Sequence, residues 1–431
     1  MQGQKPMRRV AIVGGLRIPF ARSMGAYARQ SNQQMLVAVL RGLVERFKLQ
    51  GEVLGDVGAG AVLKHSRDFN LTREAVLESG LSARTPAFDL QRACGTSLET
   101  AIVLGLKIAS GQIESAIAGG VDTASDVPIV YPDDYRDILL SASRARTLGS
   151  RLAPFLKLRP RHFRPQLPAV VEPRTGRSMG QSCELMAREW HIERRAQDEL
   201  ALESHRKAAA AWQSGFYADL VIPFGGLQQD NNIRPDTTLE RLAQLPPVFA
   251  KDGKGTLTAG NSTPMTDGAA GVLLASEEWA RAHNLTVQAY LSWGKAAAVD
   301  FEHRDGLLMA PVYAVPRLLA DAGLTLKDFD FYEIHEAFEA QVLCTLAAWE
   351  SEQFCRERLG LNGPFGTIDR SKLNVKGGSV AMGHPFAATG ARIVGTLAKL
   401  LAQRGTGRGL ISVCTAGGMG VTAILEGPHA A

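Results

Sequence analysis

Short apolar runs alternate with segments of helical periodicity along this 431-residue chain, and this alternation limits the fold more than any other feature. Residues 10–16 and 56–63 have the apolar character of strands, whereas residues 35–47 carry apolar side chains at helical spacing. Strands that alternate with helices are typical of α/β proteins. A chain of this length usually forms two or three domains and can bury several cores without disulfides or metals.

Two stretches of the sequence look like copies of one unit. In the first, a predicted helix at 96–109 leads into a strand at 115–118, and in the second a helix at 389–403 leads into a strand at 410–413. A glycine-rich turn follows each strand. Because helix–strand–glycine units are common, the pattern alone leaves both an internal duplication and a chance likeness open.

A shift in composition separates these two units. Between residues 129 and 250 prolines recur, and residues 144–164 contain seven Lys or Arg and no Asp or Glu. Helical periodicity returns near Met179 and again from about Arg194 to Gly215. We expect an inserted, partly irregular lobe in this region.

Charge and cysteine usage narrow the class of protein. The net charge of +5 is compatible with a polyanionic ligand, but no basic run is interleaved with aromatic residues, so nucleic acid is not expected. The first apolar run lacks a cleavage site and no apolar stretch approaches about 18 residues, so neither a signal peptide nor a membrane-spanning helix is expected. An odd number of cysteines without a CxxC pair argues against disulfides and zinc and favours a reducing, cytoplasmic compartment: Cys94, Cys183, Cys344, Cys355 and Cys414.

Cys94 lies where an extended segment, 87–90, gives way to a predicted helix. The free N–H groups and dipole of a helix N-terminus favour a thiolate, which is the nucleophilic form of cysteine. A lone cysteine is more often a small buried apolar residue, so the position by itself leaves both interpretations open.

Two further glycine-rich segments carry groups that can take part in catalysis. His384 stands in GGSVAMGHP, where glycines allow close backbone approach to a ligand and the imidazole could accept a thiol proton. Cys414 ends a predicted strand before the turn AGG, where α/β folds place their chemistry and where N–H groups could stabilise an oxyanion. Each segment could equally be a structural glycine turn.

A fourth segment, HEAFEAQ, raises the question of a metal. His335 and Glu339 would share one face if the segment were helical, as metal ligands often do. The HExxH pattern is absent and no third ligand is evident, so no metal site is predicted.

Together these segments resemble the thiolase family. The four signature segments agree in order and spacing: ACGTS around Cys94, HEAF at 335–338, GHPFAATGAR at 383–392 and CTAGGMG at 414–420. Supporting segments at 179–187 and 255–270 extend the resemblance to the whole chain. The histidine of HEAF, where most thiolases have asparagine, the segment 230–249 and the basic lobe most resemble the thiolase subunit of fatty-acid β-oxidation trifunctional complexes.

The resemblance implies a thiolase fold, in which two similar domains form a five-layer αβαβα sandwich with an inserted loop domain. The expected division is an N-terminal domain of residues 1–128 with 251–285, a loop domain of residues 129–250 and a C-terminal domain of residues 286–431.

The resemblance further implies a ping-pong acyl transfer between thiols. His384 deprotonates Cys94, whose thiolate attacks the 3-oxo carbon of a 3-oxoacyl-CoA. Carbon–carbon cleavage releases the acetyl-CoA enolate, Cys414 protonates it, and CoA then removes the acyl group. His384 and His335, the latter through a water, surround the enolate oxygen, and the backbone N–H groups of Cys94 and Ala416 form a second oxyanion hole.

Ligands and partners follow from the same resemblance. Thr263 contacts the pantetheine of CoA, Met179 borders the acyl pocket, and Phe338 belongs to the substrate site. CoA is a substrate, so neither a cofactor nor a metal is expected. Expected partners are acyl-CoA and CoA, a second copy in a homodimer, a hydratase/dehydrogenase α subunit and a membrane surface contacted peripherally.

Other functions stay open from sequence. A biosynthetic acetoacetyl-CoA thiolase would use the same residues. A ketoacyl-ACP synthase also has a reactive cysteine but lacks the second one, so Cys414 argues against it. A non-catalytic CoA- or lipid-binding scaffold would not need all four reactive positions, which are filled here.

The basic segment 144–164 also has several interpretations. It could be a solvated face, it could attract the CoA phosphates, or it could dock onto a partner or an anionic membrane. Leucine and phenylalanine alternate with its cations, which favours docking, because apolar residues supply burial and cations supply steering.

Overall fold

A computed structural model describes residues 7–168, 171–250 and 252–429. Ten strands in these residues form one sheet in the order β4-β3-β5-β6-β1-β7-β10-β9-β8, with β2 paired to β6. The α/β class predicted from the alternation is confirmed. The strands are β1 (Val10–Arg17), β2 (Ala21–Arg22), β3 (Asp56–Ala59), β4 (Ala87–Asp89), β5 (Ser115–Asp122), β6 (Thr266–Ser276), β7 (Ala289–Ala298), β8 (Phe331–Ile334), β9 (Arg408–Thr415) and β10 (Met419–Glu426).

The sheet consists of two halves with the same strand order. The N-terminal half runs β3-β5-β6-β1 and the C-terminal half runs β8-β9-β10-β7. In each half the first strand along the chain pairs antiparallel with the last, β1 with β6 and β7 with β10. The outer pairs, β3 with β5 and β8 with β9, are parallel. This shared topology is the internal duplication that the sequence left open. The halves meet where β1 pairs with β7 at two positions.

Helices complete a five-layer sandwich around the two half-sheets. Helices α3 (Thr96–Ala109) and α14 (Thr389–Arg404) pack against each other and touch strands of both halves, so they form the middle layer. Helices α1 (Asn32–Arg46) and α2 (Leu71–Ser79) cover the outer face of the N-terminal half. Helices α10 (Ala310–Ala322) and α11 (Glu339–Glu350) share the outer core of the C-terminal half. The predicted αβαβα arrangement is confirmed.

The middle layer depends on close backbone approach. A Cβ atom on Gly15 of β1 would lie 2.7 Å from the Cα atom of Gly395 in α14, so only glycine lets the helix rest directly on the strand. Near Cys94, a Cβ atom on Gly390 would lie 2.4 Å from the backbone nitrogen of Leu98, and this contact holds the two middle helices together.

The segment between β5 and β6 contains most of the remaining structure. A capping box of Ser178 and Gln181 begins α6 (Met179–Glu189), and the long helix α7 (Arg194–Gln213) follows close to the predicted limits. Within the described part of the chain, no helix is both long enough and apolar enough to cross a bilayer. The remaining short elements are α8 (Leu239–Ala243), α9 (Glu277–Ala282), η3 (Leu326–Asp328), α12 (Glu352–Phe354), the π turn η4 (Cys355–Leu359), η5 (Arg370–Lys372), α13 (Ser379–Met382) and η6 (Phe386–Ala388).

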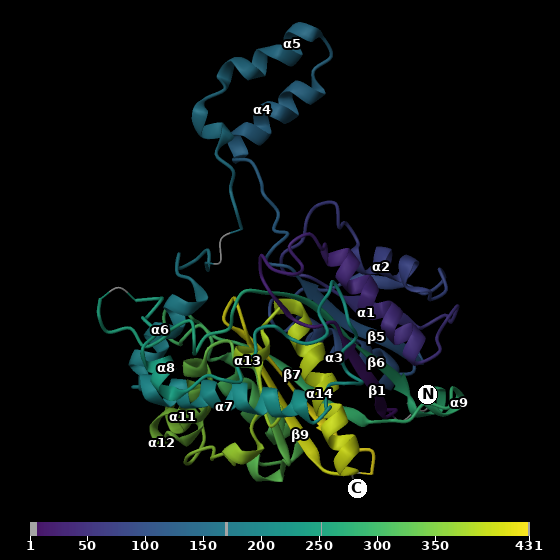
Figure 1. Cartoon of the computed structure of the whole chain (residues 1–431), viewed down its shortest axis with the longest axis vertical. Helices are drawn as coiled ribbons and strands as arrows, with labels where there is room; N and C mark the ends of the chain where they lie inside the picture. Colours follow the sequence, from purple (N-terminus) through teal and green to yellow (C-terminus); the bar gives the residue numbers. More distant parts are fainter. Residues whose placement is uncertain (1–6, 169–170, 251, 430–431) are drawn as a thin grey trace.

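Residues 130–166 form an arm that stands away from the body of the molecule (Figure 1). Backbone hydrogen bonds between Val130 and Gln166 close its base. The arm carries α4 (Asp133–Arg144), α5 (Leu148–Leu152), η1 (Ala153–Lys157) and η2 (Pro160–Phe163). The basic segment predicted from sequence thus forms most of a projecting element.

The arm buries little of its own apolar surface. Only Ile138, Ala142 and His162 are buried within it. Leu156 is 89% exposed, and other large apolar side chains of the arm are also exposed: Leu148, Leu152 and Phe163.

Candidate active site

Cys94 lies in a tight turn at the start of α3. Ala93 adopts a positive φ of 45°, and the Thr96 hydroxyl accepts a hydrogen bond from the backbone N–H of Arg92 and donates one to Ala93. Burial raises the pKa of the Cys94 thiol to about 12, although the backbone N–H of Ala416 acts in the opposite direction. The helix N-terminus was expected to favour a thiolate. Desolvation outweighs it, so this thiol needs a base before it can attack.

His384 is the candidate base. Gly383 precedes it with a φ of 106°, and the His384 backbone N–H donates to the Thr266 hydroxyl at 3.2 Å. Its Nδ1 lies 2.6 Å from the Thr389 hydroxyl, while its Nε2 is buried and has no hydrogen-bond partner among the described residues. Burial, with a smaller contribution from Arg392, lowers the pKa of His384 to about 3. The imidazole is therefore neutral in this structure, as a group that is to act as a base must be.

His335 follows β8 and lies beside His384, with 4.1 Å between their ring centroids. Its backbone N–H donates to Ser412 at 2.8 Å, and its Nδ1 lies 2.9 Å from the Ser379 hydroxyl, which also accepts from Arg392. Its Nε2 is likewise buried without a partner in the described structure. Burial, with His384 and Arg392 adding to it, lowers the pKa of His335 well below its ordinary value.

Three of the predicted groups converge on one point. A ligand atom of Cys94, one of His335 and one of His384 all lie within 4.8 Å of one another. Cys414 is buried near the end of β9, and burial together with the nearby Cys94 raises the pKa of its thiol well above the usual range. The fold therefore gathers all four predicted reactive side chains, from segments up to 320 residues apart (94 to 414), at one end of the strands.

The metal pair weighed from sequence does not form. His335 follows the end of β8, and the helix begins only at Glu339, so the two side chains do not share a helix face. Glu339 is not part of the group around Cys94. The other acid of the segment, Glu336, accepts hydrogen bonds from Ser204, Asn374 and the backbone N–H of Val380 and so braces the site.

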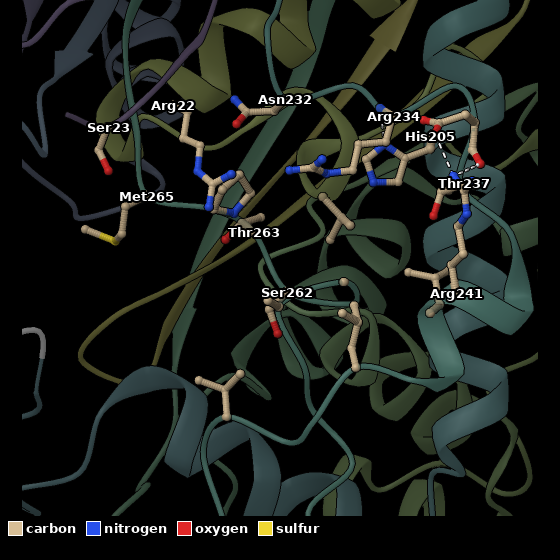
Figure 2. Close-up of a pocket in the computed structure, with 18 of the residues that line it drawn as sticks. Arg22, Ser23, His205, Asn232, Arg234, Thr237, Arg241, Ser262, Thr263 and Met265 are labelled. Carbon is tan, nitrogen blue, oxygen red and sulfur yellow. Dashed lines mark hydrogen bonds and ion pairs between the residues drawn. The ribbon is translucent and has the colours of Figure 1, made fainter. Parts of the chain in front are cut away.

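A cavity of about 620 Å³ is lined in part by Val380, which lies four residues before His384, and Figure 2 shows its lining. Thr263, the predicted CoA contact, lines it and donates to the backbone oxygen of Ala337. Phe249 lines the cavity, and Phe338 packs against Phe249 with 5.7 Å between the ring centroids. Met179 packs in the same apolar cluster as these two rings. Ionisable groups also line the cavity: Arg22, His205, Arg234, Asp236 and Arg241, of which Asp236 and Arg241 form an ion pair.

Family comparison agrees with this geometry. Residues 10–278 match the thiolase N-terminal domain family, and residues 285–427 match the thiolase C-terminal domain family. The chain belongs to the thiolase family.

Relatives of this thiolase are similar along nearly their whole length. The chain is 42% identical over 424 residues to the 3-ketoacyl-CoA thiolase of Pectobacterium carotovorum subsp. carotovorum, covering 97% of this chain and 96% of that one. It is equally identical to the 3-ketoacyl-CoA thiolase of Yersinia pestis, with 97% of both covered.

Solved structures give the same result for the fold. The acetyl-CoA acetyltransferase of Bacillus anthracis superimposes with a TM-score of 0.81 at 29% identity, over 98% of this chain and 99% of that one. Human mitochondrial 3-ketoacyl-CoA thiolase superimposes with a TM-score of 0.80 at 29% identity, over 97% and 99%.

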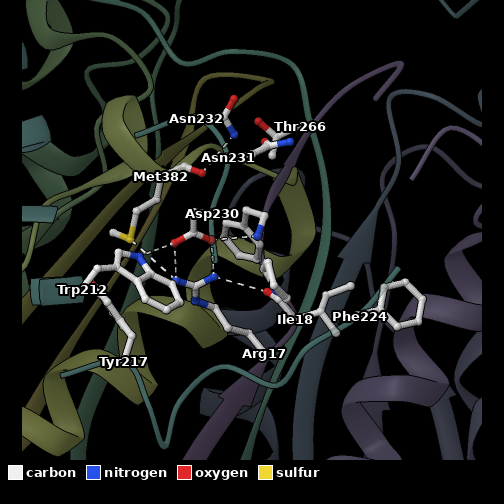
Figure 3. Close-up of polar contacts among 12 residues, drawn as sticks. Arg17, Ile18, Trp212, Tyr217, Phe224, Asp230, Asn231, Asn232, Thr266 and Met382 are labelled. Carbon is white, nitrogen blue, oxygen red and sulfur yellow. Dashed lines mark hydrogen bonds and ion pairs between the residues drawn. The ribbon is translucent and has the colours of Figure 1, made fainter. Parts of the chain in front are cut away.

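Sequence reasoning missed two polar contacts that brace the thiolase site. The Glu172 carboxylate accepts a hydrogen bond from the backbone N–H of Gly417, directly after Ala416. Arg17 and Asp230 form a buried two-bond ion pair at 2.5 and 2.7 Å (Figure 3). Glu172 lies in none of the segments that carry the resemblance, and Asp230 begins the segment 230–249 without a pattern that predicts its pairing with Arg17.

The Arg17–Asp230 pair connects the inserted segment to the catalytic loop. Asp230 also accepts from the backbone N–H of Phe20 and from the indole of Trp212. Two residues later, the Asn232 amide donates to the backbone oxygen of Met382, next to Gly383 and His384. The segment around Asp230 therefore joins β1, α7 and the loop that carries His384.

Proposed function

We propose that this chain is a 3-ketoacyl-CoA thiolase that cleaves 3-oxoacyl-CoA with CoA in fatty-acid β-oxidation, through an acyl group on Cys94. The observation that carries the proposal is the convergence of Cys94, His335 and His384 within 4.8 Å, with Cys414 buried beside them. The names of the relatives support it, since two at 42% identity are 3-ketoacyl-CoA thiolases.

In the proposed mechanism, Nε2 of His384 takes the proton of the Cys94 thiol. The sulfur attacks the 3-oxo carbon, and the alkoxide that forms is stabilised by the N–H groups of Cys94 and Ala416. Its collapse breaks the carbon–carbon bond and leaves an enolate, whose oxygen faces His384 and His335. Cys414 protonates the enolate carbon, so one thiol proton ends in acetyl-CoA.

The second half-reaction regenerates the enzyme. Cys414, now a thiolate, takes the proton of an incoming CoA thiol. The CoA sulfur attacks the acyl group on Cys94 and releases acyl-CoA, while Cys94 recovers its proton from His384. Both protons are accounted for without a redox step, so the proposed reaction uses no cofactor and CoA serves as a substrate.

The 620 Å³ cavity is the proposed CoA site. Thr263 would meet the pantetheine, and Arg22 and Arg234 would pair with the phosphates. Met179 and Phe338 would border the acyl chain near Phe249. In this proposal the arginines of the cavity attract the CoA phosphates. From the sequence alone, the basic segment 144–164 was one candidate for that role.

We also propose partners for the exposed parts of the fold. β4 is an edge strand that ends five residues before Cys94, and pairing of two copies there would extend the sheet into a homodimer. The arm, with exposed leucines and cations, would dock a hydratase/dehydrogenase α subunit or an anionic membrane surface. The free cysteines suit a reducing cytoplasm.

Two measurements on the purified full-length protein test the function. Addition of CoA to acetoacetyl-CoA should remove the Mg²⁺-enolate absorbance, and a series of longer 3-oxoacyl-CoA substrates should be cleaved as well. After incubation with acyl-CoA, peptide mass analysis should find the acyl group on Cys94. Cys94→Ser should abolish labelling, whereas Cys355→Ala serves as the control. No cleavage of any substrate, or acylation of another cysteine, would contradict the proposal.

A further inference from the structure

The group around Cys94 also has the composition of a metal site. It offers one thiol and two imidazole nitrogens, and these ligand types are the ones that Zn²⁺ prefers. All three atoms lie within 4.8 Å of one another and come from three different segments of the chain. No cysteine or histidine spacing in the sequence indicates such a site.

The two imidazoles are presented in the way that zinc ligands usually are. Each has its Nδ1 within hydrogen-bond distance of a hydroxyl, Ser379 for His335 and Thr389 for His384. Contacts of this kind through one ring nitrogen orient metal-binding histidines. Both Nε2 atoms are buried and lack a hydrogen-bond partner among the described residues. Both nitrogens are therefore available to bind a ligand.

The spacing suits a small tetrahedral ion. Zinc bonds of about 2.3 Å to sulfur and about 2.0 Å to nitrogen place neighbouring ligand atoms roughly 3.5 Å apart in a tetrahedron. The widest pair of ligand atoms must therefore approach by at most about 1.3 Å, the difference between 4.8 Å and roughly 3.5 Å. The fourth position would hold a water, because no other cysteine, histidine or acid of the described residues belongs to the group.

We propose that the unacylated site binds one Zn²⁺ through Cys94 Sγ, His335 Nε2 and His384 Nε2, and that this ion inhibits the enzyme. Binding replaces the S–H bond by an S–Zn bond and releases one proton to solvent, with no change in oxidation state. The ion occupies both the nucleophile and the base. Once Cys94 is acylated, its sulfur is part of a neutral thioester and can no longer bind the ion as a thiolate, so substrate protects the enzyme. The binding itself stands apart from the proposed function, and only the inhibition depends on it.

The proposed site requires a histidine at position 335, where most thiolases have asparagine. With asparagine in its place, only one thiol and one imidazole would remain. Loss of a supporting hydrogen bond alone typically lowers metal affinity 10–100-fold, so loss of a direct ligand should cost at least about 100-fold. His335→Asn is accordingly the variant that separates a three-ligand site from incidental binding at a reactive thiol.

The test uses Co²⁺ as a spectroscopic probe for Zn²⁺ on the full-length, chelator-treated protein. One equivalent of Co²⁺ should produce a thiolate-to-cobalt band in the near ultraviolet and tetrahedral bands in the visible, and Zn²⁺ should displace it. Cys94→Ser should lose the thiolate band, and His335→Asn should bind at least about 100-fold more weakly. Cys355→Ala, remote from the group, is the matched control and should titrate as the wild type does.

Blocking Cys94 in the unmodified chain keeps the test independent of whether the variants fold. Wild-type protein alkylated or acylated at Cys94 should show no thiolate band. A band that survives this treatment, equal affinity in His335→Asn, or the absence of any band would overturn the inference. A protein that binds cobalt through Cys94 but cleaves no 3-oxoacyl-CoA would retain the metal site and refute the proposed function. An enzyme that cleaves 3-oxoacyl-CoA but is not inhibited by Zn²⁺ would retain the proposed function and refute the inhibitory metal site.

Discussion

The Glu172 carboxylate lies 2.6 Å from the backbone nitrogen of Gly417 and accepts its hydrogen bond. The acid belongs to a turn in which the backbone N–H of Glu172 donates to Arg177 and that of Gly176 donates to Glu172. The glycine follows Ala416, whose N–H faces Cys94. A side chain of the inserted segment thus sets the position of a donor in the proposed oxyanion hole.

Glu172→Ala should lower kcat by about tenfold with little change in KM. Full loss of one oxyanion donor typically costs 10²–10³ in kcat, and here the Ala416 donor is only loosened. Glu172→Gln, which keeps an acceptor oxygen, should recover most of the rate. Steady-state kinetics with acetoacetyl-CoA measure this, and equal activity of the Ala and Gln variants would show that the contact does not act on the hole.

Cys414→Ala should keep acylation of Cys94 but lose turnover. The residue is proposed to move the proton at the acetyl carbon, and such proton transfer typically contributes 10²–10⁴-fold. The sensitive measurement is exchange of the acetyl-CoA methyl protons with deuterated solvent, which should fall by that factor. Wild-type exchange in this variant would assign the proton transfer to another group.

Asp230→Asn should destabilise the fold strongly. Arg17 is buried, and removal of one partner from a buried pair typically costs about 3–5 kcal/mol, because the remaining charge stays unpaired. The free energy of unfolding, measured in urea, should fall by that amount. Glu199→Gln is the matched control, since its partner Arg195 is solvent-exposed, and it should change little. A small effect at Asp230 would mean that water reaches the pair.

His205→Gln should change how stability depends on pH. Burial, with Arg234 adding to it, lowers the pKa of His205 to about 4, whereas an unfolded histidine titrates near 6.5. Between these values the unfolded chain binds the extra proton, so the contribution of His205 is present above about pH 6.5 and is lost as pH falls toward 4. The wild type should therefore lose about 1.4 kcal/mol more per pH unit than the variant in this window.

Urea unfolding at several pH values from 7 to 4.5 measures the difference. Gln can still accept the hydrogen bond that the Arg234 backbone N–H donates to His205. Parallel slopes for wild type and His205→Gln would mean that His205 is protonated in the folded protein.

Charge reversal on the arm should weaken docking without affecting catalysis. Arg161 already pairs with Asp134, so the substitutions are Lys157→Glu, Arg159→Glu and Arg164→Glu. Co-purification with a hydratase/dehydrogenase subunit, or sedimentation with phosphatidylserine vesicles, should fall and become less sensitive to salt. The control reverses three exposed charges elsewhere: Arg29, Arg84 and Lys327.

The two association measurements identify the partner of the arm. Loss of subunit binding alone would favour the protein partner, and loss of vesicle binding alone would favour the membrane. If neither changes and the KM for CoA rises, the arm attracts the CoA phosphates instead. If the control variant loses as much binding as the arm variant, the loss comes from the change in net charge and not from the arm.

Local patterns in the sequence were enough to predict most of the elements and the reactive residues. The helix at 96–109 has the predicted limits, and that at 389–403 extends by one residue to Arg404. The strand predicted at 56–63 was too long and ends at Ala59. The backbone N–H groups of Val62 and Leu63 donate to the Asp122 carboxylate instead of a neighbouring strand, and no local pattern reveals that acceptor.

The sequence by itself determined which side chains are the candidates for the chemistry and which half of the duplicated fold each occupies, because periodicity and signature segments are local. Only the tertiary structure decided that Cys94, His335 and His384 meet within 4.8 Å, that burial raises the pKa of the Cys94 thiol, and that Glu172 and Asp230 brace the site. Distance and desolvation depend on what the rest of the chain places around a group, and neither is written in its neighbouring residues.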